Sequence, residues 1–357
     1  MSDSYKKSGV DIDIDKPWID FIKQSSGLGA SKSLLAKEKK LISKIGEYAA
    51  VYEISADSLI ACCVDGIGSK LLWTLQGLGS MESVAQDLVA MNVNDLICVG
   101  ADPVLFFDYL AVGNPKMLQG GGLLQGFIKG IQAACAKSGC LLAGGETAQL
   151  PDIYKGNEFD ASGTAIGTLN SQNYLSTNMV EQDSELWYWP SSGPHSNGYT
   201  WLRKIFNPKD DKQFIQQELM NPTSLYVESF KGLKNFCQLK KSKFTSPIIQ
   251  SVYHITGGGM LNLLRAQSEN KFGFQLSKLY KDELPLWVKE VKQRTNSSWE
   301  EILKSFNCGI GLVIVIDKNF AKEFSAELGE LKLQKLGKII SQQKIIIEDF
   351  KIELCPQ

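Results

Sequence analysis

The sequence predicts an α/β (or α+β) protein of two domains, and three observations lead to this prediction. At 357 residues the chain is longer than the roughly 250–300 residues at which a single core stops growing. Strand-like and helix-like segments alternate in both halves, which is typical of sheets covered by helices. A polar stretch over residues 169–185 separates the two halves. We therefore predict an N-terminal domain over residues 1–170 and a C-terminal domain over residues 171–357.

In the N-terminal half, short runs rich in β-branched and aromatic residues indicate strands, and apolar residues that recur every three or four positions indicate helices. Residues 24–46, which are rich in Gly, Ser and Lys, are expected to form a solvated loop and a short amphipathic helix. The predicted strands are 49–54, 59–64, 103–112 and 160–168, with a further apolar strand from 141, and the predicted helices are 84–99 and 123–138.

The C-terminal half begins with an aromatic stretch at 186–189 that alternates as a strand does. A helix is predicted to begin at Tyr199, after a turn rich in Gly, Ser and Pro. Further helices are predicted at 225–236 and 260–265, and the continuous apolar run at 309–316 predicts a buried strand.

Composition and charge exclude several classes of protein. The 38 basic and 39 acidic residues leave a net charge of −1, which gives no field to attract nucleic acid or an anionic membrane. The first residues lack the apolar core of a signal peptide, and no apolar run is long enough to span a bilayer. The eight cysteines include no CxxC pair, which favours reduced, buried thiols over a metal–thiolate site. We therefore expect a cytoplasmic protein without nucleic-acid or membrane partners.

The only two histidines stand in similar surroundings. His195 lies in a turn between a predicted strand and a predicted helix, and His254 precedes three glycines and another predicted helix. Free N–H groups at the start of a helix suit an anion such as phosphate. If the His195 turn stood alone, a hydrophilic turn capped by Ser196 or Asn197 would explain it. Because both histidines lie beside a glycine-rich helix start, we favour a binding site. The predicted substrate-binding residues are Gly193, Ser196, Asn197, Thr256, Gly257, Gly258 and Gly259.

A carboxylate ends the predicted strand 59–64, and a glycine-rich turn follows it. Asp65, Gly66, Gly68 and Lys70 resemble a phosphate-binding loop only superficially, because the P-loop spacing is absent. Asp65 could simply cap a tight turn, or it could hold the Mg²⁺ of a nucleotide, which takes one or two carboxylates besides phosphate oxygens.

The helix predicted around residues 86–100 carries a second polar group. Asp87, Asn94 and Asp95 fall within one arc of roughly 100° on this helix, opposite an apolar side. An exposed amphipathic helix would look similar. The arc contains no Lys or Arg, however, and acids and amides without basic partners favour a metal–phosphate site.

Glu146 follows two glycines at the end of the predicted strand from 141. It is either a third acid for a nucleotide-bound cation or a residue at the start of a helix, and the sequence leaves both open.

Seven motifs occur in one order along the chain, and together they resemble the phosphoribosylformylglycinamidine cyclo-ligase family, also called the aminoimidazole ribonucleotide synthetases. The motifs lie at residues 4–13, 65–71, 87–96 with 100–103, 144–151, 192–199, 254–259 and 306–311. Because they span residues 4 to about 316, the resemblance covers nearly the whole chain.

The resemblance implies a fold and a reaction. The fold is a two-domain PurM-like architecture, in which the N-terminal sheet pairs with that of a second subunit in a homodimeric barrel and an α/β domain follows. The reaction uses ATP and Mg²⁺ to close the imidazole ring of formylglycinamidine ribonucleotide. Its products are 5-aminoimidazole ribonucleotide, ADP and phosphate, in a step of purine biosynthesis.

The resemblance also implies roles for single residues. Asp65 and Asp95 would be the carboxylates for ATP and Mg²⁺, and Lys23, His195 and His254 would be catalytic. The wider ATP-binding set is Asp65, Gly66, Gly68, Lys70, Asn94, Asp95 and Glu146. Which histidine moves a proton stays open, and we expect the His195 ring to be partly exposed toward a cleft between the domains.

One segment departs from the family. The family carries a Gly-Gly-Phe-Gly loop that closes over ATP, whereas this chain has Gly46, Glu47, Tyr48, Ala49 and Ala50, so loop closure is left open.

Other relatives of this architecture fit less well. Selenophosphate synthetase needs a reactive Cys or selenocysteine in its N-terminal segment, and the first cysteine here is Cys62. The hydrogenase-maturation relative ends in a reactive cysteine, and Cys355 is not terminal. A non-catalytic nucleotide-binding homologue remains an alternative.

Overall fold

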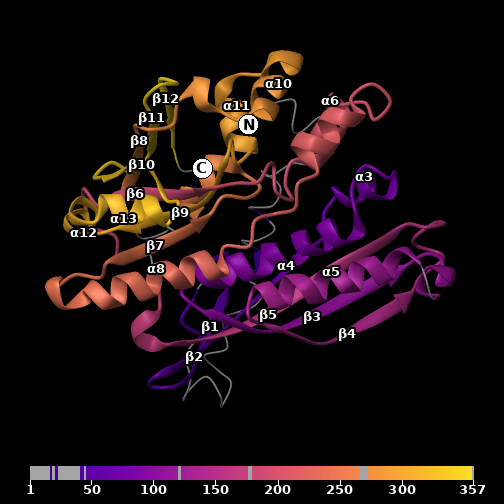
Figure 1. Ribbon diagram of the computed structural model, residues 1–357, viewed down its shortest axis with the longest axis horizontal. Coiled ribbons are helices and arrows are strands. Elements are labelled where there is room, and N and C mark those ends of the chain that lie inside the picture. Colours follow the sequence, from indigo (N-terminus) through magenta and orange to yellow (C-terminus); the bar gives the residue numbers. More distant parts are fainter. Residues whose placement is uncertain are drawn as a thin grey trace.

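The computed structural model describes residues 17, 21–22, 41–43, 46–119, 122–175, 179–265 and 272–355. Lys23 and the motif at residues 4–13 lie outside these ranges. The described chain forms two sheets, one in each half (Figure 1). No helix within the described ranges is long and apolar enough to cross a membrane.

The first half forms a five-stranded sheet in the order β1-β2-β5-β3-β4. All neighbouring strands are antiparallel except β3 and β4, which are parallel. The predicted strands are confirmed, with bounds that differ by a few residues: β1 (Ala50–Ser55), β2 (Ser58–Gly66), β3 (Asp102–Val112), β4 (Leu141–Gln149) and β5 (Phe159–Asn170).

Two helices cover one face of this sheet, namely α4 (Met81–Cys98) and α5 (Leu123–Lys137) (Figure 1). They confirm the helices predicted at 84–99 and 123–138. Helix α4 begins earlier than predicted because the Ser80 hydroxyl caps it by accepting a hydrogen bond from the Ser83 N–H. The short helix α3 (Leu71–Leu75) precedes it.

In the described part of the chain, the opposite face of the five-stranded sheet is open (Figure 1). Its outward residues include large apolar side chains, and Val64, Tyr109 and Leu141 are 69%, 43% and 70% exposed. Open apolar faces of this kind are typical of protein–protein contacts.

The second half forms a seven-stranded sheet in the order β12-β11-β8-β10-β6-β9-β7. The strands predicted at 186–189 and 309–316 are confirmed as β6 and β9. The strands are β6 (Glu185–Pro190), β7 (Ile249–His254), β8 (Gly273–Leu276), β9 (Ile310–Ile316), β10 (Gln334–Ile340), β11 (Ile345–Ile347) and β12 (Ile352–Leu354). Strand β9 is buried along its whole length and runs antiparallel between β6 and β7.

Most helices of the second half are short, and α8 is the longest of them. Those predicted from Tyr199 and over 225–236 are confirmed as α6 and α8, whereas the helix predicted at 260–265 is split into a 3₁₀ turn (Gly259–Leu261) and α9. The helices are α6 (Tyr199–Ile205), α7 (Lys212–Phe214), α8 (Val227–Lys240), α9 (Asn262–Arg265), α10 (Leu286–Thr295), α11 (Trp299–Ser305), α12 (Lys318–Glu323) and α13 (Ser325–Glu330).

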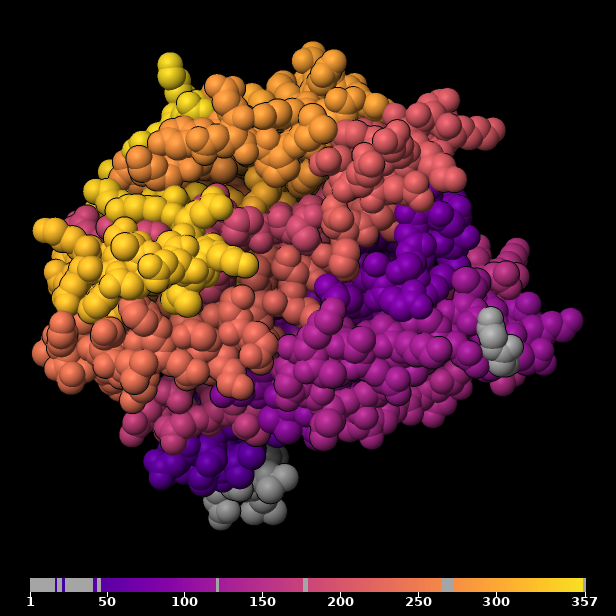
Figure 2. Space-filling model, in the orientation of Figure 1, coloured from indigo at the N-terminus to yellow at the C-terminus, as the bar shows by residue number. Residues whose placement is uncertain are grey.

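Helix α4 lies where the two halves meet. It packs on β2 and β5 of its own sheet and also contacts β7 and α8 of the second half. In the space-filling view the two halves are in contact along a broad seam (Figure 2). Residues of α4 are therefore able to meet side chains from the second half.

The packing around Gly311 leaves no space for a side chain. A Cβ at this position would overlap the Tyr226 hydroxyl and lie 3.2 Å from Cε1 of His195. We expect Gly311→Ala to lower the free energy of unfolding by about 1–3 kcal/mol, as overpacking does. The matched control is Gly329→Ala in α13, where a Cβ meets nothing within 4 Å, so stability should be unchanged or slightly raised. Chemical denaturation measures both variants, and equal effects would contradict the prediction.

Candidate active site

A cleft of about 540 Å³ opens between the two halves. Five of the predicted site residues line it, and they come from four separate segments of the chain. They are Asp65, Asp95, Asn197, Thr256 and Gly257. The segment 46–50, which departs from the family pattern, forms another part of the wall.

His254 is the last residue of β7, and its side chain is fully buried. Its Nδ1 lies 2.9 Å from Oδ1 of Asp95, which is on α4 and is 16% exposed. Because a carboxylate accepts hydrogen bonds, Nδ1 carries the proton in the neutral ring and Nε2 is left as the basic nitrogen. Asn94 Nδ2 lies 3.5 Å from that Nε2. Carboxylate, imidazole and amide thus form one hydrogen-bonded group beside the cleft.

His195 is also completely buried, so the expectation of a partly exposed ring is wrong. Its Nε2 accepts a hydrogen bond from the Ser192 N–H at 3.3 Å and lies 3.5 Å from the Tyr226 hydroxyl. Nδ1 is buried and has no hydrogen-bond partner among the described residues. Burial, together with the nearby charges of His254 and Lys70, holds the pKa of His195 well below its usual range, which keeps the ring neutral.

The backbone of His195 is unusual, with φ at +61°. A non-glycine residue in this left-handed region costs roughly 1–2 kcal/mol. The ring centroid of His195 lies 6.3 Å from that of His254. The strained turn therefore places the two imidazoles side by side.

The sequence predicts that the acids in the polar arc of α4 have no basic partner. This prediction is wrong for Asp87, which pairs with Lys70. Lys70 Nζ lies 2.8 Å from Asp87 Oδ2, and both side chains are fully buried. Burial lowers the pKa of Lys70 and raises that of Asp87, while each charge opposes the shift of the other. The sequence predicts that Lys70 binds ATP, but its ammonium lies among protein oxygens and does not line the cleft.

Asp87 and Asn94 instead hold residues 221–226 of the second half. Asp87 Oδ1 accepts hydrogen bonds from the backbone N–H and hydroxyl of Thr223, at 2.7 and 2.6 Å. Asn94 donates to the Ser224 carbonyl at 2.9 Å and accepts from the Tyr226 N–H at 3.1 Å. Of the three residues in the arc, only Asp95 lines the cleft. Sequence reasoning missed residues 221–226, since nothing in this polar stretch marks them as partners of α4.

The glycine-rich turn after β2 packs against the turn that holds His195. Asp65 accepts a hydrogen bond from the Gly66 N–H at 2.7 Å. Gly68 adopts a φ of +71°, and a Cβ there would lie 3.5 Å from the Ser196 carbonyl oxygen. The Ser196 hydroxyl in turn points toward the Ile67 carbonyl at 3.4 Å. The glycine-rich turn after Asp65 and the turn that holds His195 thus contact each other.

The turn after His254 is braced by one side chain. Asn262 Nδ2 donates to the carbonyls of Thr256, Gly257 and Gly259. Gly257 is exposed on the cleft wall, whereas Gly258 and Gly259 are buried. The helical segments that follow have three and four residues. Binding of an anion at the turn over residues 257–259 stays a prediction.

Glu146 lies within β4 and not at the start of a helix. The pairing register places Asp65, Gly163, Asp108 and Gly145 in one row across the sheet. Because successive residues of a strand point to opposite faces, Glu146 points away from the face that carries Asp65. It therefore does not join Asp65 as an acid of the same group.

The segment 46–50 contacts the second half through Tyr48. The Tyr48 hydroxyl donates a hydrogen bond to the His254 carbonyl at 3.3 Å, and the side chains of Tyr48 and Ala49 are almost fully buried. Burial and the neighbouring Glu47 carboxylate raise the pKa of Tyr174 to about 12. In this structure the segment is docked onto the wall that carries His254.

Solved structures with the same fold include two that are complexed with nucleotides. A HypE–HypF complex has a TM-score of 0.60 at 15% identity, covering 92% of this chain and 99% of that chain. AaThiL complexed with AMPPCP and TMP has a TM-score of 0.58 at 14% identity, covering 89% and 92% of the two chains. PurL of T. maritima complexed with ADP has a TM-score of 0.57 at 14% identity, covering 92% of this chain and 48% of that one. At these identities the likeness concerns the fold alone.

The sequence itself matches two family models over most of its length. The N-terminal domain of AIR synthase related proteins matches residues 46–169, and the C-terminal domain matches residues 181–349. A phosphoribosylformylglycinamidine cyclo-ligase of Thermoanaerobacter pseudethanolicus (strain ATCC 33223 / 39E) is 31% identical over 358 residues, which cover 96% of this chain and 99% of the relative. The chain therefore belongs to the AIR synthase family, among the phosphoribosylformylglycinamidine cyclo-ligases.

Proposed function

We propose that this chain closes the imidazole ring of formylglycinamidine ribonucleotide at the expense of ATP, releasing 5-aminoimidazole ribonucleotide, ADP and phosphate. The observation that carries the proposal is the full-length relationship to a cyclo-ligase, together with a cleft that is lined by Asp65 and Asp95, of which Asp95 is hydrogen-bonded to the buried His254. A non-catalytic nucleotide-binding homologue is the alternative, and no feature of the described cleft favours it.

The reaction requires a formamide oxygen to leave. Transfer of the γ-phosphoryl group of ATP to this oxygen makes the carbon electrophilic, and the amidine-derived nitrogen then attacks it. The ring closes as phosphate departs with the oxygen and the nitrogen loses a proton. The protein has to align the reactants and stabilise charge on the transferred group.

His254 fits the proton transfer better than His195. Asp95 fixes its Nδ1–H, which orients the ring, and Nε2, which Asn94 Nδ2 approaches at 3.5 Å, is the nitrogen that would take the proton. His195 stays neutral in its buried position, and no described residue accepts a hydrogen bond from its Nδ1–H. We assign proton transfer to His254 and a hydrogen-bonding role to His195. Lys23, outside the described residues, remains a proposed catalytic residue from the family resemblance.

The carboxylates of the cleft suit a nucleotide-bound cation. No group of three or more His, Cys, Asp or Glu side chains within the described residues could hold a metal by itself. Mg²⁺ in ATP sites is bound by one or two carboxylates together with phosphate oxygens, and Asp65 and Asp95 both line the cleft. These two residues would hold Mg²⁺, which would offset charge on the phosphates.

The binding partners of the remaining site residues follow from where they lie. Asn197, Thr256 and Gly257 line the cleft and would contact the substrate, and Gly193, Ser196, Gly258 and Gly259 belong to the turns that carry them. Gly66 and Gly68 form the turn after Asp65 and would lie near the phosphates of ATP if Asp65 holds its Mg²⁺. A cytoplasmic location agrees with eight cysteines that form no disulfide.

The first test is whether ADP release depends on formylglycinamidine ribonucleotide. We expect one ADP for each aminoimidazole ribonucleotide, measured by a coupled assay for ADP and a colorimetric assay for the aromatic amine. ATP hydrolysis without the ribonucleotide, or nucleotide binding without turnover, would instead support the alternative.

Asp95→Asn should reduce kcat by roughly 10²–10⁴-fold, the range typical of general acid–base catalysis. The amide keeps the size of the side chain, but it cannot stabilise a protonated His254 or hold Mg²⁺. Asp102→Asn is the matched control, because Asp102 is 63% exposed and pairs with Lys234 at the surface. Steady-state kinetics at saturating Mg²⁺ and ATP compare the two variants. A kcat near wild type for Asp95→Asn would exclude the proposed role.

A homodimer is the proposed assembly, and the open face of the first sheet is its interface. Tyr109→Glu with Leu141→Glu places two charges on that face, and we expect the mass in solution to fall from dimer to monomer. Leu239→Glu is the control, since Leu239 is 80% exposed on α8 of the other half. Light scattering after size-exclusion chromatography measures the masses. A wild-type chain of monomer mass would contradict the assembly.

A further inference from the structure

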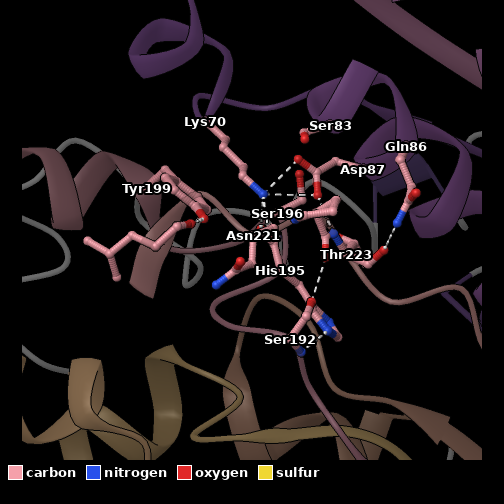
Figure 3. A network of polar contacts seen from close by, with 12 residues as sticks. Lys70, Ser83, Gln86, Asp87, Ser192, His195, Ser196, Tyr199, Asn221 and Thr223 are labelled. Carbon is pink, nitrogen blue, oxygen red and sulfur yellow. Dashed lines mark hydrogen bonds and ion pairs between the residues drawn. The ribbon is translucent and has the colours of Figure 1, made fainter. Parts of the chain in front are cut away.

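The ammonium of Lys70 is enclosed by oxygen atoms from three other segments. It lies 2.8 Å from Asp87 Oδ2 and donates to the carbonyls of Asn221 at 2.6 Å and His195 at 3.2 Å (Figure 3). Lys70 and Asp87 both have no exposed side-chain surface. The three N–H donors of an ammonium group are thus matched by three partners.

These partners belong to both halves of the molecule. Lys70 follows the turn after β2 and Asp87 is on α4, whereas His195 and Asn221 are in the second half. Thr223 adds two hydrogen bonds to the same carboxylate (Figure 3). A buried ion pair of this kind need not add stability, because desolvation offsets much of the attraction between the charges. Its more specific effect is to fix geometry.

The geometry that it fixes is that of His195. The residue is in the left-handed region at φ +61°, and Lys70 holds its carbonyl. On the other side of the residue, the ring is bounded by the Ser192 N–H, the Tyr226 hydroxyl and His254. Without the ammonium, the strained peptide has no such anchor and the ring is free to shift relative to His254.

We propose that Lys70 is a positioning residue that acts through the backbone carbonyl of His195. It keeps this imidazole in register with the Asp95–His254 pair, and it does not contact ATP. The kinetic part of this inference rests on the proposed cyclo-ligase function, whereas its structural part does not.

The kinetic test uses Lys70→Met and the double variant Lys70→Met/Asp87→Asn. The single variant leaves a buried carboxylate without its cation and should lower Tm. The double variant removes that charge, while the amide introduced at position 87 still offers an oxygen to Thr223, so Tm should recover in large part. If Lys70 positions His195, kcat of the double variant stays roughly 10- to 100-fold below wild type, since small misplacements of this kind are costly. The KM for ATP should change little, because Lys70 does not line the cleft.

Lys234→Met is the matched control. It also removes an ion pair between the two halves, with Asp102, but at the surface and away from both histidines. We expect kcat, KM and Tm near wild type. Recovery of both Tm and kcat in Lys70→Met/Asp87→Asn would overturn the proposal, because the pair would then be structural only. A large rise in the KM for ATP would overturn it in favour of nucleotide binding.

The second readout uses the fact that the chain has only two histidines. Labelling with ¹⁵N-histidine therefore gives two imidazole spin systems, which His195→Gln assigns. In Lys70→Met/Asp87→Asn the His195 signals should move by more than those of His254, and Lys234→Met should move neither. Unchanged His195 signals would overturn the proposal. Because this measurement needs no turnover, it tests Lys70 even if the ADP assay rejects the cyclo-ligase activity.

Discussion

The contact between α4 and residues 221–226 is the constraint on which the site depends. Asp87 and Asn94, seven positions apart and so on one side of the helix, bind backbone groups of the second half. Bonds to main-chain groups specify the register of two segments, which a purely apolar contact would leave free to slide. Asp95 directly follows Asn94, and for this reason it meets Nδ1 of His254. One helix thus joins the halves and supplies one of the two carboxylates that line the cleft.

Much of the first half could be predicted because its elements are long and regular. Strands such as β2 and β5 alternate between more buried and more exposed residues, and α4 carries a continuous apolar side. After residue 265, the sequence predicts only β9. The short helices α10 to α13 and the strands β10 to β12 have three to ten residues each, too few for periodicity to distinguish them from loops. Their positions depend on contacts with the rest of the sheet.

The cleft residues that lie within a sequence motif, such as Asp65, Asn197 and Gly257, could be predicted. Which side chains are buried, and which of them pair with each other, could not be predicted. The turn around His195 is rich in Ser, Gly and Asn, which predicts exposure, yet the His195 side chain is completely buried. Lys70 and Asp87 are separated by 17 residues in different elements, so no spacing reveals their contact. The face on which Glu146 lies follows from strand register, which the sequence alone does not contain.

Strand β9 limits how far the distance between the two histidines can change. His254 is the last residue of β7 and His195 lies in the turn after β6, and these two strands run in the same direction on either side of β9. The ends of β6 and β7 are therefore two steps of a hydrogen-bond ladder apart, each about 4.8 Å. The turn after β6 then brings the His195 ring within 6.3 Å of the His254 ring. Substitutions elsewhere in the sheet leave this spacing unchanged as long as that turn keeps its left-handed residue and the middle strand keeps a glycine at 311.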